Sequence, residues 1–303
     1  MAKWSGLGRL LTPTLAVAAV AASILPTTNA LAGEVDLTAI GVDTTLTVPA
    51  DFGGDGLVAN YHTQPAGTGV FDPFLTLERT AAGGNPAGIE SAYNTDGHTA
   101  LYLDQQRPEW NTTLRLSDLA VIDVNGKTYY GFELDANEPG AGKSLLSVDN
   151  VRIYTSAIDN TAAVGNDESK LETPSPLGDL RWAMNDPLKQ ATYNIDNWIK
   201  LDSNQSDVDA KSNGGSGISD MILYVPTDAF KDAGADDFVW FYNLNGVHYV
   251  ADSDLAAEAG YEEWRAVIGP NTVPDGGNTL VLFGTAIAAL GVVARRRKVA
   301  NAA

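Results

Sequence analysis

The sequence predicts an all-β body, a β-sandwich or jelly-roll-like fold, flanked by an N-terminal signal helix and a C-terminal transmembrane helix. Three observations predict this arrangement. The middle of the chain alternates apolar and polar residues with a period of two, the pattern of half-buried strands. Gly, Asn and Asp separate these segments at short intervals, as in sandwich folds. Both ends of the chain instead carry apolar stretches next to basic residues.

Three parts divide the 303-residue chain: a signal peptide over 1–32, an extracellular β-sandwich body over 33–270 and a sorting signal over 273–298. A body of about 240 residues can bury a large core, and β-sandwiches of this size often form one domain. No internal repeat is evident, which weighs against a propeller or a solenoid.

Residues 1–32 have the layout of a secretory signal peptide. Lys3 and Arg9 supply the positive start, and a mostly apolar stretch follows over 10–25. Ala30 and Ala32 then place small residues at the two positions that a signal peptidase reads. We therefore expect cleavage after Ala32 and export of the rest of the chain.

The expected strands share β-branched, aromatic and other apolar residues bounded by turn residues. They cover residues 35–40, 57–61, 70–77, 100–103, 112–116, 119–124, 128–134, 146–154, 180–184, 198–201, 221–225, 238–244, 247–250 and 264–268. The segment 238–242 is apolar at every position, which predicts a buried strand. Most aromatic residues are therefore expected in the core, whereas an exposed row of them would stack on sugar rings.

The connections carry weaker signals than the strands. Asn125 and Gly126 predict a hairpin, because this pair readily adopts the two positive φ values of a type I′ turn. A second hairpin is expected over 243–247. Helix signals are limited to 227–231 and 255–259, and the polar segment 159–176 is expected to be a long loop or a hinge.

The C-terminal segment combines a short motif, an apolar stretch and a basic end. The uncharged stretch 279–294 would span about 24 Å as a helix, which is short for a bilayer core of about 30 Å. The basic cluster should stay in the cytoplasm, so the body lies outside. The motif residues are Val273, Pro274, Asp275, Gly276 and Gly277, and the basic residues are Arg295, Arg296, Arg297 and Lys298.

This tail resembles the PEP-CTERM class of sorting signals, especially its VPDSG variant, with Gly276 in place of the serine. The resemblance implies recognition by an exosortase-type processing enzyme and cleavage near the motif. It also implies transient anchoring in the inner membrane, then a place at the cell surface, in the outer envelope or outside the cell, often among exopolysaccharide. An ordinary C-terminal membrane anchor is the alternative, and it also places the body outside.

The body is similar to a set of uncharacterised extracellular proteins that carry this kind of tail. The matching stretches include LLSVDNVRIY at 145–154, GISDMILYVP at 217–226 and YEEWRAV at 261–267. The similarity extends over most of the body but implies no particular activity.

Composition excludes several function classes. The chain carries 19 basic and 38 acidic residues, and without its ends the body has a net charge of about −24. Such a surface repels phosphate backbones, so we expect no nucleic-acid partner. There are no cysteines, which excludes thiol catalysis and Cys-ligated zinc.

Calcium is the one metal that the sequence suggests. Glu133, Asp135 and Glu138 lie at a strand end, and Asp149 lies within another strand. Calcium binds six to eight oxygen ligands, so these carboxylates form a candidate site if the two strands are neighbours. The alternative is that acidic and amide residues simply make turns here.

No catalytic constellation stands out. His62, His98 and His248 are the only histidines, and no two have a ligand spacing. No nucleophile elbow occurs. We therefore expect a non-catalytic surface or matrix protein. The alternatives are a carbohydrate-binding module, with or without calcium, and an extracellular hydrolase, which would show a cleft with two carboxylates of divergent pKa.

Overall fold

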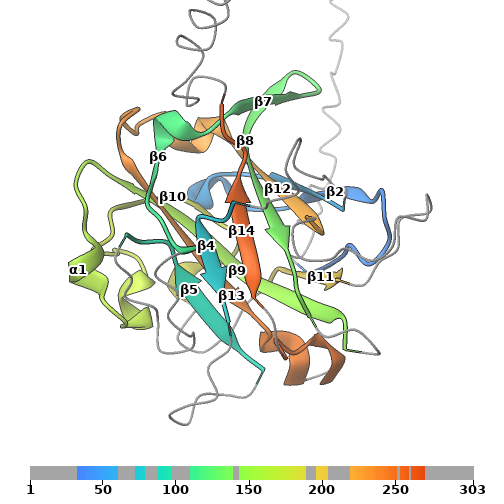
Figure 1. Cartoon of the computed structure of the whole chain (residues 1–303). Coiled ribbons are helices and arrows are strands. Elements are labelled where there is room, and N and C mark those ends of the chain that lie inside the picture. The colour runs from blue at the N-terminus through green and yellow to red at the C-terminus, as the bar shows by residue number, and fades with distance from the viewer. Residues whose placement is uncertain are drawn as a thin grey trace, which may run out of the picture. The chain divides into compact units, whose positions relative to one another are not determined.

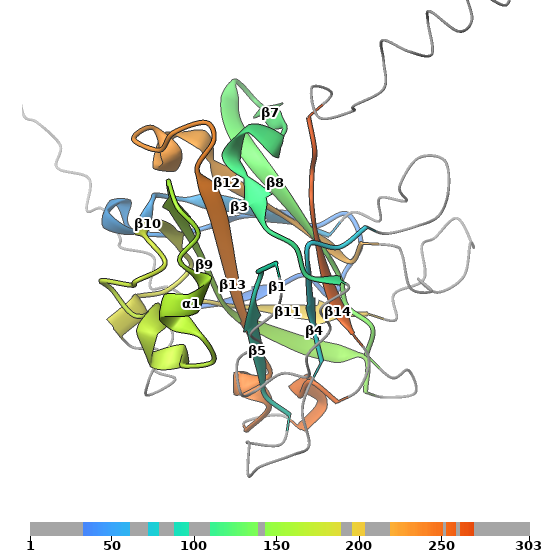
Figure 2. The same ribbon diagram turned by 60° about the vertical axis from the view of Figure 1, so that its left-hand side comes forward.

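Two seven-stranded sheets form the body of the chain in the computed structural model (Figures 1 and 2). The structure describes residues 33–60, 72–78, 88–96, 110–138, 143–188, 196–203, 219–250, 253–258 and 261–269. Within these ranges strands dominate, and each helix has only three or four residues. The predicted all-β sandwich is therefore confirmed.

Sheet A is built around two long antiparallel strands, β9 and β13. All its pairings are antiparallel except that of β1 with β11 at one edge. Its members are β1 (Glu34–Asp36), β11 (Trp198–Asp202), β9 (Leu145–Ser156), β13 (Phe238–Asn245) and β5 (Glu90–Tyr93), with β10 (Asp179–Ala183) also on β9 and β6 (Leu114–Arg115) also on β13.

Sheet B is antiparallel throughout. Its central strand β8 pairs with three others, β12, β14 and β7. Its members are β2 (Asp43–Leu46), β3 (Gly56–Ala59), β12 (Met221–Pro226), β8 (Lys127–Asp135), β14 (Glu262–Ala266) and β4 (Leu75–Leu77), with β7 (Val121–Val124) also on β8.

The main core lies between the two sheets. Phe241 of β13 packs against Trp264 of β14 and Phe132 of β8, at ring-centroid distances of 4.8 and 5.0 Å. Phe74 meets the edges of the Phe132 and Phe241 rings. Since successive strand residues point to opposite faces, one alternate set from each sheet supplies this core.

A second apolar cluster covers the outer face of sheet A. The segment after β9 contains α1 (Thr161–Val164) and the 3₁₀ helix η4 (Glu168–Leu171), and it packs against Tyr154, Trp240 and Tyr242. Tyr242 donates a hydrogen bond to Glu168, and the buried Arg152 donates to the Leu171 carbonyl at 2.7 Å. This cover explains why β13 is apolar on both faces, and it shows that the expected loop 159–176 is packed.

The strongest turn signal is confirmed. Asn125 and Gly126 take φ values of 55° and 81° and join β7 to β8 as a hairpin. Asp123 fixes the turn by accepting a hydrogen bond from the Gly126 amide at 3.0 Å. In Figures 1 and 2 this hairpin stands at one end of the body, and the chain after β13 lies at the opposite end.

Other local expectations are corrected. Residues Val247–Val250 form a 3₁₀ helix, η7, rather than a strand, so no second hairpin follows β13. The sequence missed β2 and β5, while 227–231 does begin with the 3₁₀ helix η6 (Thr227–Phe230). Residues Ser253–Leu255 form η8, which reaches only the start of the helix expected over 255–259. The remaining single-turn helices are η1 (Ala50–Phe52) and η3 (Leu116–Asp118).

Within the ranges given above, no helix is long and apolar enough to cross a membrane. The expected signal helix over 1–32, the transmembrane stretch 279–294 and the strand 100–103 lie outside the described residues.

Candidate functional sites

The outer face of sheet B is hollowed beside the β7–β8 hairpin. Because Leu223 and Val225 lie in the core, Tyr224 between them points to this outer face and is half-buried. Two cavities of about 440 and 380 Å³ open here, and hairpin residues line both. We call them together the sheet B hollow. The larger is lined by Gly53, Gly54, Asp55, Gly126, Lys127, Thr128, Tyr129, Pro226 and Asp228; the smaller by Asp43, Thr44, Thr45, Leu57, Val58, Ala59, Val124, Asn125 and Tyr224.

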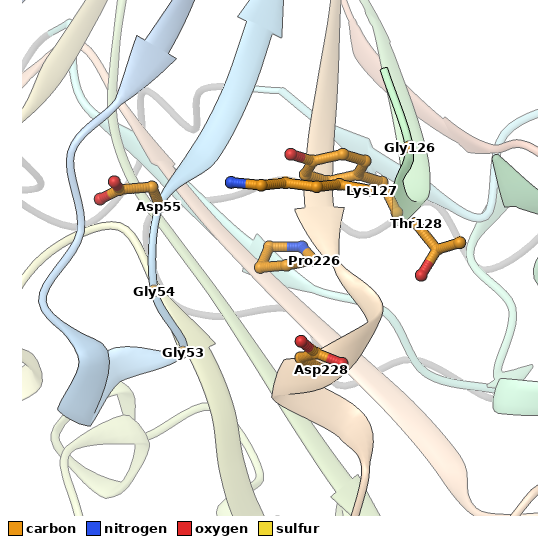
Figure 3. A pocket seen from close by; sticks show the side chains of 9 residues that line it. Gly53, Gly54, Asp55, Gly126, Lys127, Thr128, Pro226 and Asp228 are labelled. Carbon is orange, nitrogen blue, oxygen red and sulfur yellow. The ribbon is translucent and has the colours of Figure 1, made fainter. Parts of the chain in front are cut away.

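The sheet B hollow mixes charged, hydroxyl and aromatic groups. Figure 3 shows Lys127 pointing toward the side that carries Asp55, with Asp228 beyond Pro226. Asp55 is held in place because its Oδ1 accepts a hydrogen bond from the Val48 amide at 2.9 Å. The lining thus offers hydrogen-bond donors and acceptors around a partly exposed tyrosine face.

A histidine–aspartate contact that the sequence did not predict lies at the end of the body opposite the β7–β8 hairpin. Asp149 of β9 is fully buried, and its Oδ1 lies 2.5 Å from Nδ1 of His248 on η7. The Ser147 hydroxyl donates to Asp149 at 2.9 Å, and the His248 ring stacks on Trp198 with centroids 4.2 Å apart. Burial raises the pKa of Asp149, against the opposing effect of its hydrogen bond to His248.

This arrangement has two of the three members of a nucleophilic triad, the imidazole and the carboxylate. In a Ser-His-Asp site the hydroxyl meets the imidazole nitrogen that faces away from the carboxylate. Here the Ser147 hydroxyl instead donates to Asp149 itself and accepts from the His248 backbone amide at 3.3 Å. The contacts of His248 therefore anchor η7 to β9 and β11.

Replacing His248 by alanine is expected to lower the free energy of unfolding by about 1–3 kcal/mol, because Asp149 would lose a partner at a buried site. His248→Asn, whose amide can donate to Asp149, should lose less. Urea unfolding followed by circular dichroism measures both. Equal losses in the two variants would show that ring stacking on Trp198, and not the hydrogen bond, carries the effect.

The four candidate calcium ligands do not meet at one place. The expected site required neighbouring strands, but Asp149 lies on β9 in sheet A, while Glu133 and Asp135 lie on β8 in sheet B. Glu133 is ion-paired with Arg265. Glu138 accepts hydrogen bonds from the Glu258 amide at 3.0 and 3.2 Å.

In the part of the chain that the structure describes, no group of three or more His, Asp or Glu side chains could hold a metal ion. The calcium interpretation of these four carboxylates therefore gains no support from their positions.

Two buried glutamates face each other between the sheets. Glu90 of β5 and Glu262 of β14 are 0% and 1% exposed, and a hydrogen bond joins their side chains. Asn245 donates a further hydrogen bond to Glu90 at 2.7 Å. Burial raises the pKa of Glu262 well above its usual range, and the nearby Glu90 and Glu138 raise it further. The burial of Glu262 and its acidic neighbours therefore favour the protonated form of this carboxyl, which lies between the two sheets.

A second acidic group lies across sheet B at the ends of β8 and β12. Glu263 stands opposite Asp135 in the β14–β8 register. Burial, with a contribution from Asp135, raises the pKa of Glu263 to about 7. Burial also raises the pKa of Asp220 well above its usual range, although its carboxylate accepts a hydrogen bond from the Ala136 amide at 2.7 Å.

The targeting residues lie outside the described part of the chain. These are the signal cleavage residues Ala30 and Ala32, the motif 273–277 and the basic cluster 295–298. The histidines His62 and His98 also lie outside the described residues. For the cleavage residues and the basic cluster, the sequence expectations stay predictions.

Comparison with known proteins bears on the tail alone. The VPDSG-CTERM motif matches residues 272–298. No curated protein and no solved structure matches the chain. The matched range includes every residue from Val273 to Lys298 that the sequence assigned to sorting. The C-terminal segment is therefore a PEP-CTERM-like sorting signal, and the chain is a sorting-domain protein.

Proposed function

We propose that the chain is an exported surface or matrix protein without catalytic activity. Its tail holds it in the inner membrane until an exosortase-type enzyme cuts near Val273, after a signal peptidase has cut after Ala32. The observation that carries the proposal is the VPDSG-CTERM match over 272–298. The dense sandwich and the acidic surface support a role as a soluble, stable cargo.

The sorting step is tested by substitution within the motif. A double variant, Pro274→Ala with Asp275→Ala, is expected to stay membrane-bound and full-length at its C-terminus, because the enzyme no longer recognises it. Immunoblots of membrane and surface fractions measure the processed share. A control with Asn271→Ala, just before the matched range, should be processed like the original chain. Normal processing of the double variant would contradict the proposal.

Carbohydrate binding at the sheet B hollow is the second candidate function. Small polar ligands bind in concave sites that combine apolar surface with a few placed polar groups. Tyr224 offers a ring face, and Thr44, Thr45 and Asn125 offer hydroxyl and amide groups for sugar hydroxyls. Three carboxylates against one lysine favour a neutral sugar chain over an acidic one.

Tyr224→Ala is expected to weaken binding to a neutral exopolysaccharide at least about tenfold, which corresponds to the loss of one stacking contact. Glycan-array binding and calorimetry measure it, with and without a chelator to test for calcium. Trp110→Ala, which removes an aromatic residue exposed elsewhere, is the control. Absence of glycan binding by the unmodified protein would exclude this second function and leave the sorting proposal intact.

A further inference from the structure

The folded body holds the chain until shortly before the sorting motif. After β14, the Val267 carbonyl accepts a hydrogen bond from the Ala120 amide at 2.8 Å, and Ile268 forms a β-bridge with Leu119. The Gly269 amide then donates to the Asp118 carbonyl at 3.1 Å. The last described residue of the body is thus hydrogen-bonded to the segment that precedes β7.

The sequence leaves a short tether beyond this point. Only residues 270–272 separate Gly269 from Val273. Four Cα steps span at most about 14 Å even when fully extended. An enzyme that acts near Val273 must therefore approach within about that distance of Gly269.

The surface around this point carries exposed apolar side chains. Val121 is 61% exposed and Ile268 is 48% exposed, and they flank the buried Leu119 on neighbouring segments. They are two of the five large apolar residues exposed among the residues that the structure describes. We call the residues 118–121 and 268–269 the exit surface.

The rim of the exit surface carries three acidic side chains, those of Asp118, Asp123 and Asp236, and one basic side chain, that of Arg115, which donates to the Asp236 carbonyl at 2.7 Å. Asp118 accepts a hydrogen bond from the Arg115 amide at 2.8 Å, and Asp123 is exposed at the end of β7. Asp236 lies exposed on the loop whose Ala235 carbonyl accepts from the Ser117 amide at 2.7 Å. An apolar centre with acidic neighbours fits a protein surface with a basic rim better than it fits anionic lipid headgroups.

We infer that the exit surface docks on the outward-facing part of the processing enzyme while the motif occupies the enzyme's active site. The inference rests on the proposed sorting function and adds the partner surface that it requires. With so short a tether, the enzyme must come close to the folded body, so a compatible surface speeds processing and an incompatible one slows it. Lengthening the tether should remove the requirement.

A four-way comparison in cells tests this inference. The variants are the original chain, V121E with I268E, and each of these with twelve Gly and Ser residues inserted after Gly269, which adds about 40 Å of reach. The charged double variant should be processed about tenfold more slowly, and the long tether should restore the rate to within about twofold. The matched control, I158E with L188E, changes two apolar residues elsewhere that are at least as exposed, and it should be processed normally.

Each result supports or overturns the inference. Pulse-chase labelling measures the rates, and protease resistance of the extracted protein reports that each variant is folded. Unchanged processing of V121E with I268E, equal slowing of the control, or slowing that the long tether does not relieve would overturn the inference. If the original chain is not processed even when the enzyme is present, the proposed sorting function itself fails.

Discussion

Replacing Trp264 by alanine is expected to lower the free energy of unfolding by about 3–5 kcal/mol. Trp264 lies on the inner face of sheet B, is fully buried and packs against Phe241 of sheet A. Its indole nitrogen donates a hydrogen bond to Asn243 on β13 at 2.9 Å. The substitution therefore opens a cavity between the sheets and leaves a buried amide oxygen without its donor.

Urea unfolding followed by far-ultraviolet circular dichroism measures the Trp264 effect without relying on tryptophan fluorescence. Trp110→Ala is the matched control, because Trp110 is 39% exposed and its ring makes an edge contact with the Tyr261 ring. We expect the control to change the free energy of unfolding by less than about 1 kcal/mol. Similar losses in both variants would contradict a core shared by the two sheets.

Raising the pH above about 5 is expected to destabilise the body through the Glu90–Glu262 pair. An ordinary glutamate has a pKa of 4.5. In the folded protein, burial and the acidic neighbours of Glu262 raise its pKa above that value. The folded state therefore holds a proton that the unfolded state releases. This stabilisation is fully present below pH 4.5 and is lost as the pH rises through the folded pKa, at about 1.4 kcal/mol per pH unit.

Glu262→Gln should flatten this dependence. The amide can still donate to Glu90 but carries no proton that titrates, so the slope of stability against pH should fall by about one proton. Asp220 and Glu263, whose pKa values are also raised, continue to titrate in both proteins. Urea midpoints between pH 5 and 9 measure the two slopes. Parallel profiles would show that Glu262 does not hold the proton.

Local signals in the sequence predicted much of the fold. The period-two alternation predicted most of the strands. The Asn125-Gly126 pair predicted the β7–β8 hairpin, because these two residues readily adopt positive φ values. The segment Val247–Val250 was misjudged because apolar residues after a strand look alike in a strand and in a 3₁₀ turn. There, His248 contacts Asp149, 99 residues earlier in the chain, and no local pattern encodes such a contact.

The sites in the body depend on partners that are distant in sequence, so the sequence could not reveal them. Glu90 and Glu262 meet only because β5 and β14 belong to different sheets that face each other. The sheet B hollow needs the register of β3, β12 and β8, which no local pattern specifies. The sorting tail was predictable because its motif, apolar stretch and basic end are contiguous, and the motif match confirms it.

We propose that the two ends of the chain direct its transport and that the acidic sandwich is the cargo. The intact mass of the native protein in each cell fraction tests this proposal most directly. The account predicts a surface or extracellular form that begins at Gly33 and ends near Val273. A chain of all 303 residues recovered from the cytoplasm would contradict it.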